Sequence, residues 1–176
     1  MTALVRSAAL THFTDLATAC GLDARALVAG VGLPPRCLVD PDLKVPAHLV
    51  GRLLETAAAQ AREPAFGLRL PESRRLSNLG PLALLVRDEP TLRRALETLM
   101  HHIHVHNEAV AAQVDEHGGL VVIRTELSND GAGSLRQATE LVVGVTCRLL
   151  QVLMGATWQP RLVCFTHPAP RSLAVH

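Results

Sequence analysis

Residues 108–127 read EAVAAQVDEHGGLVVIRTEL, and this segment stands out because two runs of β-type residues lie on either side of a turn signal. The adjacent Gly118 and Gly119 supply the positive φ angles that a tight two-residue turn requires. The runs EAVAAQVD and LVVIRTEL are each long enough to form a strand. The sequence therefore predicts a β-hairpin over residues 108–127.

Helical spacing of apolar residues dominates the sequence before this hairpin. Residues 46–62 open with a proline and continue in the i, i+4 rhythm of a buried stripe, and residues 90–105 show similar spacing. Residues 3–20 have helical spacing that stops at a glycine, and residues 24–32 follow an aspartate suited to cap a short helix. We therefore expect a helix over each of these four segments.

After the hairpin, residues 135–154 predict a helix that is apolar on nearly every side. Such a helix must be buried on more than one side, either at the centre of the chain or against another subunit or domain. Residues 162–165 predict a short strand, which Pro168 and Pro170 end. The expected fold is a single, helix-dominated α+β domain with a small antiparallel sheet built on the hairpin and this C-terminal strand.

The composition restricts the class of protein. With 176 residues, 48% of them apolar, the chain is long enough and apolar enough to fold as one domain. A formal net charge of +1 argues against a surface that grips nucleic-acid phosphates, and 2% aromatic residues leave too few rings to stack on bases. The sequence shows no secretion signal and no bilayer-spanning apolar stretch, so we expect a cytoplasmic location and no membrane partner.

The most conspicuous polar cluster is HHIHVH, residues 101–106. On a helix, His102 and His106 lie one turn apart and could share a metal ion. The cluster contains no carboxylate, which a catalytic zinc motif would place beside its first histidine, and histidines at the end of a helix also complement the helix dipole. We favour solvated histidines, with contact to an effector and a metal-dependent enzyme as the alternatives.

Other catalytic patterns are missing from the sequence. It contains no Gly-x-Ser-x-Gly nucleophile motif, and its two Gly-x-Gly sequences continue neither as a dinucleotide-binding fingerprint nor as a P-loop. The paired carboxylates at residues 88–89 and 115–116 fall in expected turns, where nothing would separate their pKa values for acid–base work. We predict no catalytic residues, no cofactor and no metal, and a binding or assembly domain rather than an enzyme.

An ordered set of short motifs carries a family resemblance. In chain order these are FGLRL (66–70), LGPL (79–82), TLRRAL (91–96), the hairpin, Glu140, GATWQP (155–160) and VCFTHPAP (163–170). Each motif is short, but in this order they resemble the N-terminal arabinose-binding-domain-like module of one branch of the AraC/XylS transcription regulators.

This resemblance implies an effector-sensing and dimerising domain, which in the family is followed by a C-terminal DNA-binding domain with two helix-turn-helix units. Residues 1–176 contain no counterpart of that second domain, so we expect a truncated N-terminal domain that reaches DNA only through the missing part. The apolar interior favours a small, largely apolar effector, whose binding would be transmitted to the DNA-binding domain. A ligand-free protein-interaction module is a further alternative.

Two sets of residues are candidate sites. The polar candidates for effector binding are Arg69, His104, Gln137 and Glu140. The apolar candidates for a homodimer or domain-docking face, all on the helix expected over residues 135–154, are Leu141, Val145, Leu149 and Val152.

Overall fold

The computed structural model describes residues 2–73, 75–128, 133–170 and 175. The first part of the chain forms β1 (Leu4–Arg6), η1 (Ser7–Leu10), α1 (Phe13–Ala19), α2 (Ala24–Gly30), η2 (Pro35–Leu38), β2 (Lys44–Pro46), α3 (Ala47–Ala61) and α4 (Phe66–Arg69). The second part forms η3 (Leu70–Ser73), η4 (Leu76–Leu79), α5 (Leu82–Arg87), α6 (Leu92–His106), β3 (Val110–His117), β4 (Leu120–Leu127) and α7 (Arg136–Met154). The expected helix-dominated α+β fold is confirmed.

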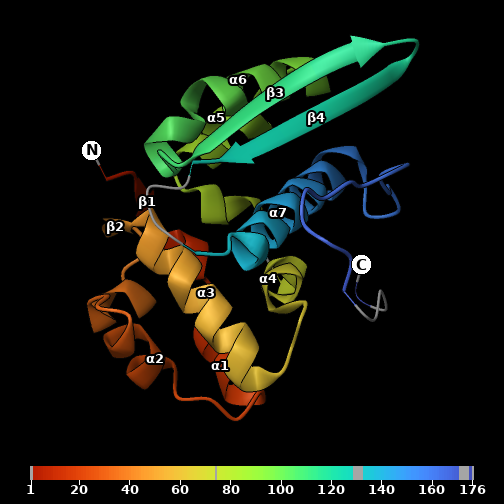
Figure 1. The fold of residues 1–176 in the computed structure, drawn as a ribbon. Helices are drawn as coiled ribbons and strands as arrows, with labels where there is room; N and C mark the ends of the chain where they lie inside the picture. The colour runs from red at the N-terminus through yellow and green to blue at the C-terminus, as the bar shows by residue number, and fades with distance from the viewer. Residues whose placement is uncertain (1, 74, 129–132, 171–174, 176) are drawn as a thin grey trace.

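These elements lie in two groups with α7 running between them (Figure 1). Helices α1 to α4 with strands β1 and β2 enclose the larger core cluster, in which the rings of Phe13 and Phe66 meet edge to face with centroids 5.9 Å apart. Helices α5 and α6 enclose a smaller cluster around Val86. Helix α7 contributes Leu141 to the larger cluster and Leu149 to the smaller one, so it is buried on more than one side, as its all-round apolar pattern predicts.

The N-terminal segment differs from the helix expected over residues 3–20. It begins as β1, which pairs antiparallel with β2, and Val5 faces Val45 with both side chains buried. His12 then takes a left-handed conformation with φ of 66°, which separates η1 from α1. Helical spacing alone was misleading here, because burial of two paired β-branched residues from distant parts of the chain outweighs a local preference for helix.

The other three predicted helices before the hairpin are confirmed as α2, α3 and α6. The carboxylate of Asp23 accepts hydrogen bonds from the backbone N–H groups of Arg25 and Ala26 at 2.8 and 3.1 Å, which caps α2. The hydroxyl of Thr91 caps α6 by accepting from the N–H of Arg94 at 3.3 Å. Local sequence signals therefore place the starts of these helices correctly.

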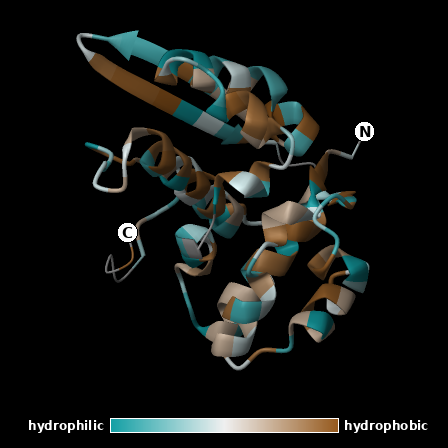
Figure 2. Ribbon diagram, turned by 180° about the vertical axis from the view of Figure 1, so that it is seen from behind, coloured by the Kyte–Doolittle hydropathy of each residue, from teal (hydrophilic) through white to brown (hydrophobic). Residues whose placement is uncertain are grey.

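The predicted hairpin is confirmed as β3 and β4, which pair antiparallel from Val110 with Leu127 to His117 with Leu120. Gly118 and Gly119 form the turn with φ angles of 57° and 78°. Near this turn, β4 is apolar on both of its faces (Figure 2). The hairpin is therefore long, regular and only partly covered by the rest of the chain.

Replacing Gly118 by valine should lower the free energy of unfolding by about 1–2 kcal/mol, because a β-branched residue is strained at positive φ. Gly118→Asn should stay within about 0.5 kcal/mol of the wild type, since asparagine adopts the left-handed region at this turn position readily. Urea denaturation of both variants checks this. Equal stability of the two variants would contradict the turn geometry.

The strand expected over residues 162–165 is wrong. Residues 155–170 pass along the surface without joining a sheet, and Leu162 is 78% exposed. No described strand pairs with this segment, so its β-type composition does not lead to a strand. The second sheet is instead the short β1–β2 pair near the N-terminus.

Among the described residues, no helix combines the length and the hydropathy needed to cross a membrane.

Candidate functional site

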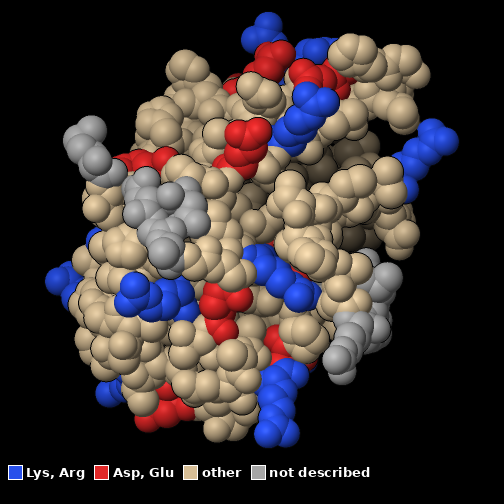
Figure 3. All heavy atoms as spheres, viewed as in Figure 1, with Lys and Arg blue, Asp and Glu red and all other residues tan. Residues whose placement is uncertain are grey.

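A pocket of about 140 Å³ lies between α6, the hairpin and α7, with η4 at one side. Alternate residues of β3, namely Val110, Ala112 and Val114, share one face and line it, and Ile123 and Thr125 on β4 continue that face. One side of helix α7, between Leu141 and Val152, forms another wall of the pocket. A space-filling view shows a hollow between the hairpin and α7 (Figure 3). The apolar faces of α6, the hairpin and α7 thus enclose the pocket.

The C-terminal end of α6, which forms one wall of the pocket, is tied to the N-terminal strands. Arg6 donates from Nη1 to Nδ1 of His106 at 3.0 Å, and Asn107 forms an antiparallel bridge with Val5. The carboxylate of Glu108 accepts from Nζ of Lys44 at 2.9 Å and from the N–H of Leu4 at 3.0 Å, and these bonds lower its pKa. The pocket wall is therefore coupled to the larger core cluster.

Most polar groups in the pocket wall bond to the protein itself. The hydroxyl of Thr146 donates to the carbonyl of Val142 at 2.9 Å, and Oδ1 of Asn107 accepts from the N–H of Ala109 at 2.9 Å. Asn78 accepts at Oδ1 from the N–H of Arg75 at 2.8 Å. These groups shape the wall while presenting few open hydrogen-bonding positions, so the pocket favours an apolar occupant.

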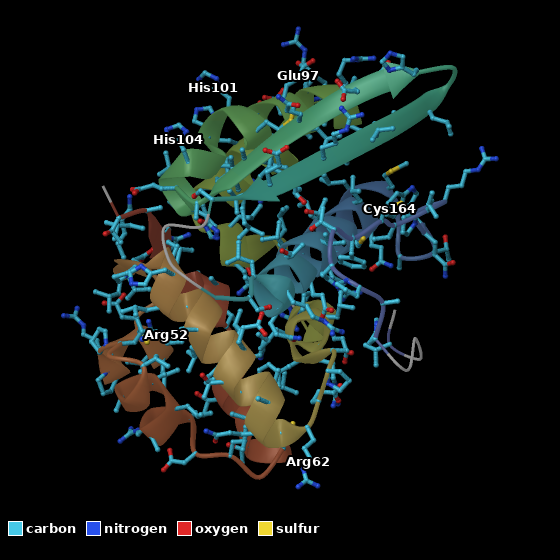
Figure 4. The ribbon with its side chains drawn as sticks, viewed as in Figure 1. Arg52, Arg62, Glu97, His101, His104 and Cys164 are labelled. Atoms are coloured by element: carbon cyan, nitrogen blue, oxygen red, sulfur yellow. The ribbon has the colours of Figure 1, made fainter. Side chains whose placement is uncertain are left out.

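The four polar candidates predicted from sequence lie outside the pocket wall. Arg69 forms an ion pair with Glu63 at 3.0 Å, and His104 lies on the exposed side of α6 (Figure 4). Gln137 and Glu140 are buried in the first two turns of α7. The structure places Gln137 against α4, and Glu140 beside Arg136 and His167, rather than in the pocket wall. A role of the four residues in ligand binding stays a prediction.

Gln137 bonds α7 to α4 and to the loop before α4, and Glu140 forms an ion pair within α7. Gln137 accepts at Oε1 from the N–H of Gly67 at 2.7 Å and donates from Nε2 to the carbonyl of Pro64 at 2.9 Å. Oε1 of Glu140 accepts from Nε of Arg136 at 2.9 Å and lies 3.5 Å from Nε2 of His167. Buried polar groups of this kind hold a helix at a fixed position, because leaving them without partners is costly.

The histidines of the 101–106 cluster point in different directions. His101 and His104 lie on the outer side of α6 with Glu97, away from α7 (Figure 4). The ring of His102 bonds to the carbonyl of Thr98 at 2.9 Å, and His106 lines the pocket. The described residues include no group of three or more His, Cys, Asp or Glu that could hold a metal ion. The geometry therefore gives no support to the metal-dependent alternative.

All four residues predicted for a dimer or docking face line the pocket. Leu141 and Leu149 are also buried within the chain, at 6% and 7% exposed, whereas Val152 is half exposed. The sequence pattern thus located the apolar side of α7, and the structure turns most of that side toward the pocket. A role of these residues in dimerisation stays a prediction.

Sequence reasoning did not find the residues that line the pocket from α6, η4 and the hairpin. Their apolar spacing was visible, but which faces meet depends on how distant elements pack. The one usable signal in the sequence is Arg148, the single charged residue in the C-terminal half of α7.

Comparison with known proteins identifies the family of this chain. A family model for the N-terminal arabinose-binding domain of AraC transcription regulators matches residues 21–176. The chain belongs to this family. It is therefore a domain of a transcription regulator and not an enzyme.

Two curated relatives carry the same name in two strains of Mycobacterium tuberculosis. The HTH-type transcriptional regulator VirS of strain CDC 1551 / Oshkosh and that of strain ATCC 25618 / H37Rv are each 29% identical to this chain over 166 residues. The match covers 93% of this chain and 49% of each relative. This AraC-family domain thus spans about half the length of the curated relatives it matches.

Proposed function

We propose that this AraC-family domain senses a small, largely apolar effector in the pocket between α6, the hairpin and α7. The observation that carries the proposal is the place of the pocket, which lies where the two core clusters meet along α7. A ligand that binds one arrangement of the two core clusters more tightly than another shifts the equilibrium between these arrangements. The difference in affinity sets the size of the shift. Helix α7 spans both clusters and is suited to transmit that shift.

The output of this domain is proposed to be control of transcription. The relatives are named as HTH-type regulators, and the matched half of each corresponds to this chain. We infer that the natural protein carries a helix-turn-helix domain outside residues 1–176, that it acts as a homodimer on DNA in the cytoplasm, and that this domain contacts DNA only through that second domain. Sedimentation of the purified domain tests the dimer, and a monomer at high concentration would count against it.

Blocking the pocket should abolish binding of a neutral apolar probe. Octan-1-ol is expected to bind the wild type in calorimetric titration, and Ala112→Phe should weaken its binding by about tenfold or more, because the ring occupies the space that the probe needs. Ala111→Phe is the matched control. Ala111 neighbours Ala112 on β3 but is exposed and points to the opposite face of the hairpin.

Failure of octan-1-ol to bind, or equal loss in both variants, would contradict the proposed pocket. The temperature of unfolding should stay close to that of the wild type in both variants, which separates a blocked pocket from a damaged fold.

A further inference from the structure

Arg148 is the one described residue in the pocket wall with a buried side-chain nitrogen that has no hydrogen-bond partner. Its Nη1 donates to Oε1 of Gln151 at 3.0 Å, whereas its Nε makes no hydrogen bond among the described residues. A guanidinium N–H that loses water without gaining a partner is costly, and the cost disappears when an acceptor binds there. Arg148 therefore combines a place in the pocket wall with a buried Nε–H that has no partner among the described residues.

The charges around the pocket favour a negatively charged acceptor. Two arginines, Arg75 and Arg148, line it together with His106, and the lining contains no carboxylate. Arg148 forms no ion pair within the described part of the chain, and its partner Gln151 is a neutral amide. By contrast, Arg36, Arg69 and several other arginines are paired with acidic side chains.

We propose that the effector is an amphipathic anion, whose apolar body fills the pocket and whose single acidic group binds the guanidinium of Arg148. This inference rests on the proposed function, because it names the chemistry of the molecule that the pocket takes. A carboxylate, a sulfonate and a phosphate monoester share this recognition chemistry, and a carboxylate matches the planar guanidinium best.

The volume of the pocket guides the choice of probe. A closed apolar cavity of about 150 Å³ holds a benzene molecule, so a pocket of about 140 Å³ has room for an apolar body of about six to eight carbon atoms. Octanoate is a suitable probe because it differs from octan-1-ol only in its head group and is ionised at neutral pH.

The test compares octanoate with octan-1-ol in calorimetric titrations of the same protein at pH 7.5. The wild type should bind octanoate about tenfold more tightly, as expected for a hydrogen bond between charged groups. Arg148→Met should remove this preference and leave octan-1-ol binding within about threefold of the wild-type value, whereas Arg148→Lys should keep part of the preference. The fluorescence of Trp158, the only tryptophan, provides a second measure of binding. The carbonyl of Trp158 accepts from Nε2 of Gln151 at 3.4 Å, and Gln151 in turn bonds to Arg148.

Arg75→Met controls for a general effect of positive charge and should keep most of the preference for octanoate. Loss of the preference in Arg75→Met but not in Arg148→Met would overturn the assignment to Arg148. Equal affinity of the wild type for the two probes would overturn the anionic effector while leaving the apolar pocket intact. Absence of binding by both probes would overturn the pocket itself. Far-ultraviolet circular dichroism shows whether each variant folds, and Arg148→Lys replaces Arg148→Met if the latter does not.

Discussion

Replacing Gly67 by alanine should lower the free energy of unfolding by about 3 kcal/mol, because α4 and α7 touch there through their backbones. A β-carbon at this position would overlap the carbonyl oxygen of Gln137 and lie 2.9 Å from its carbonyl carbon. Backbone atoms cannot rotate away as a flexible side chain can. Relief of the overlap would also disturb the hydrogen bond from the N–H of Gly67 to Gln137, whose length is 2.7 Å.

The same substitution at Gly51 is the matched control. Gly51 lies in the middle of α3, and a β-carbon there would meet only Leu135, at an ordinary contact distance of 3.8 Å. Gly51→Ala should therefore raise stability by about 0.5–1 kcal/mol, because alanine favours a helix over glycine. Urea denaturation followed by circular dichroism measures both variants. Similar stability of Gly67→Ala and Gly51→Ala would show that α4 and α7 are not packed this closely.

Arg136→Met should cost about 2–3 kcal/mol of stability, because it removes a charged partner from the fully buried side chain of Glu140. Nε of Arg136 lies 2.9 Å from Oε1 of Glu140, and the arginine side chain is 25% exposed. The remaining exposure reduces the expected loss below that of a completely buried pair. Replacing both residues, with Glu140→Gln added to Arg136→Met, should recover part of the loss, since no buried carboxylate is then left behind.

The Arg36–Asp40 pair controls for this effect because it has the same i, i+4 spacing and the same 2.9 Å separation. Arg36 is 73% exposed, so Arg36→Met should change stability by less than about 1 kcal/mol. Thermal and chemical denaturation of the two single variants gives the comparison. Equal losses of stability in Arg136→Met and Arg36→Met would mean that burial of Glu140 does not increase the contribution of its ion pair to stability.

Elements whose signal is local were predicted well. The apolar spacing of α3, α6 and α7 and the paired glycines of the hairpin each act over a few residues, because side-chain direction repeats every 3.6 residues in a helix and every two in a strand. The cap at Asp23 is equally local. The ordered motifs added the family, which the match to residues 21–176 confirms.

The candidate site was predicted less well, for a physical reason. The polar candidates Gln137 and Glu140 are buried. Gln137 bonds to α4 and α3, whereas Glu140 pairs with Arg136 on α7 and lies beside His167. His106 was seen within a histidine cluster, whereas its contact with Arg6 joins residues 100 positions apart. Nothing in the spacing of a single segment reveals such a contact.

The sequence by itself determined the secondary structure of most of this chain, the apolar faces of its helices and hairpin, and its membership of the AraC family of N-terminal domains. The tertiary structure alone decided that the N-terminus pairs as β1 with β2, that the C-terminal segment joins no described strand, and that three apolar faces leave a pocket with Arg148 at its wall. Local periodicity indicates which side of an element is apolar and will be buried. Which sides meet, and whether they meet completely, depends on the packing of the whole chain.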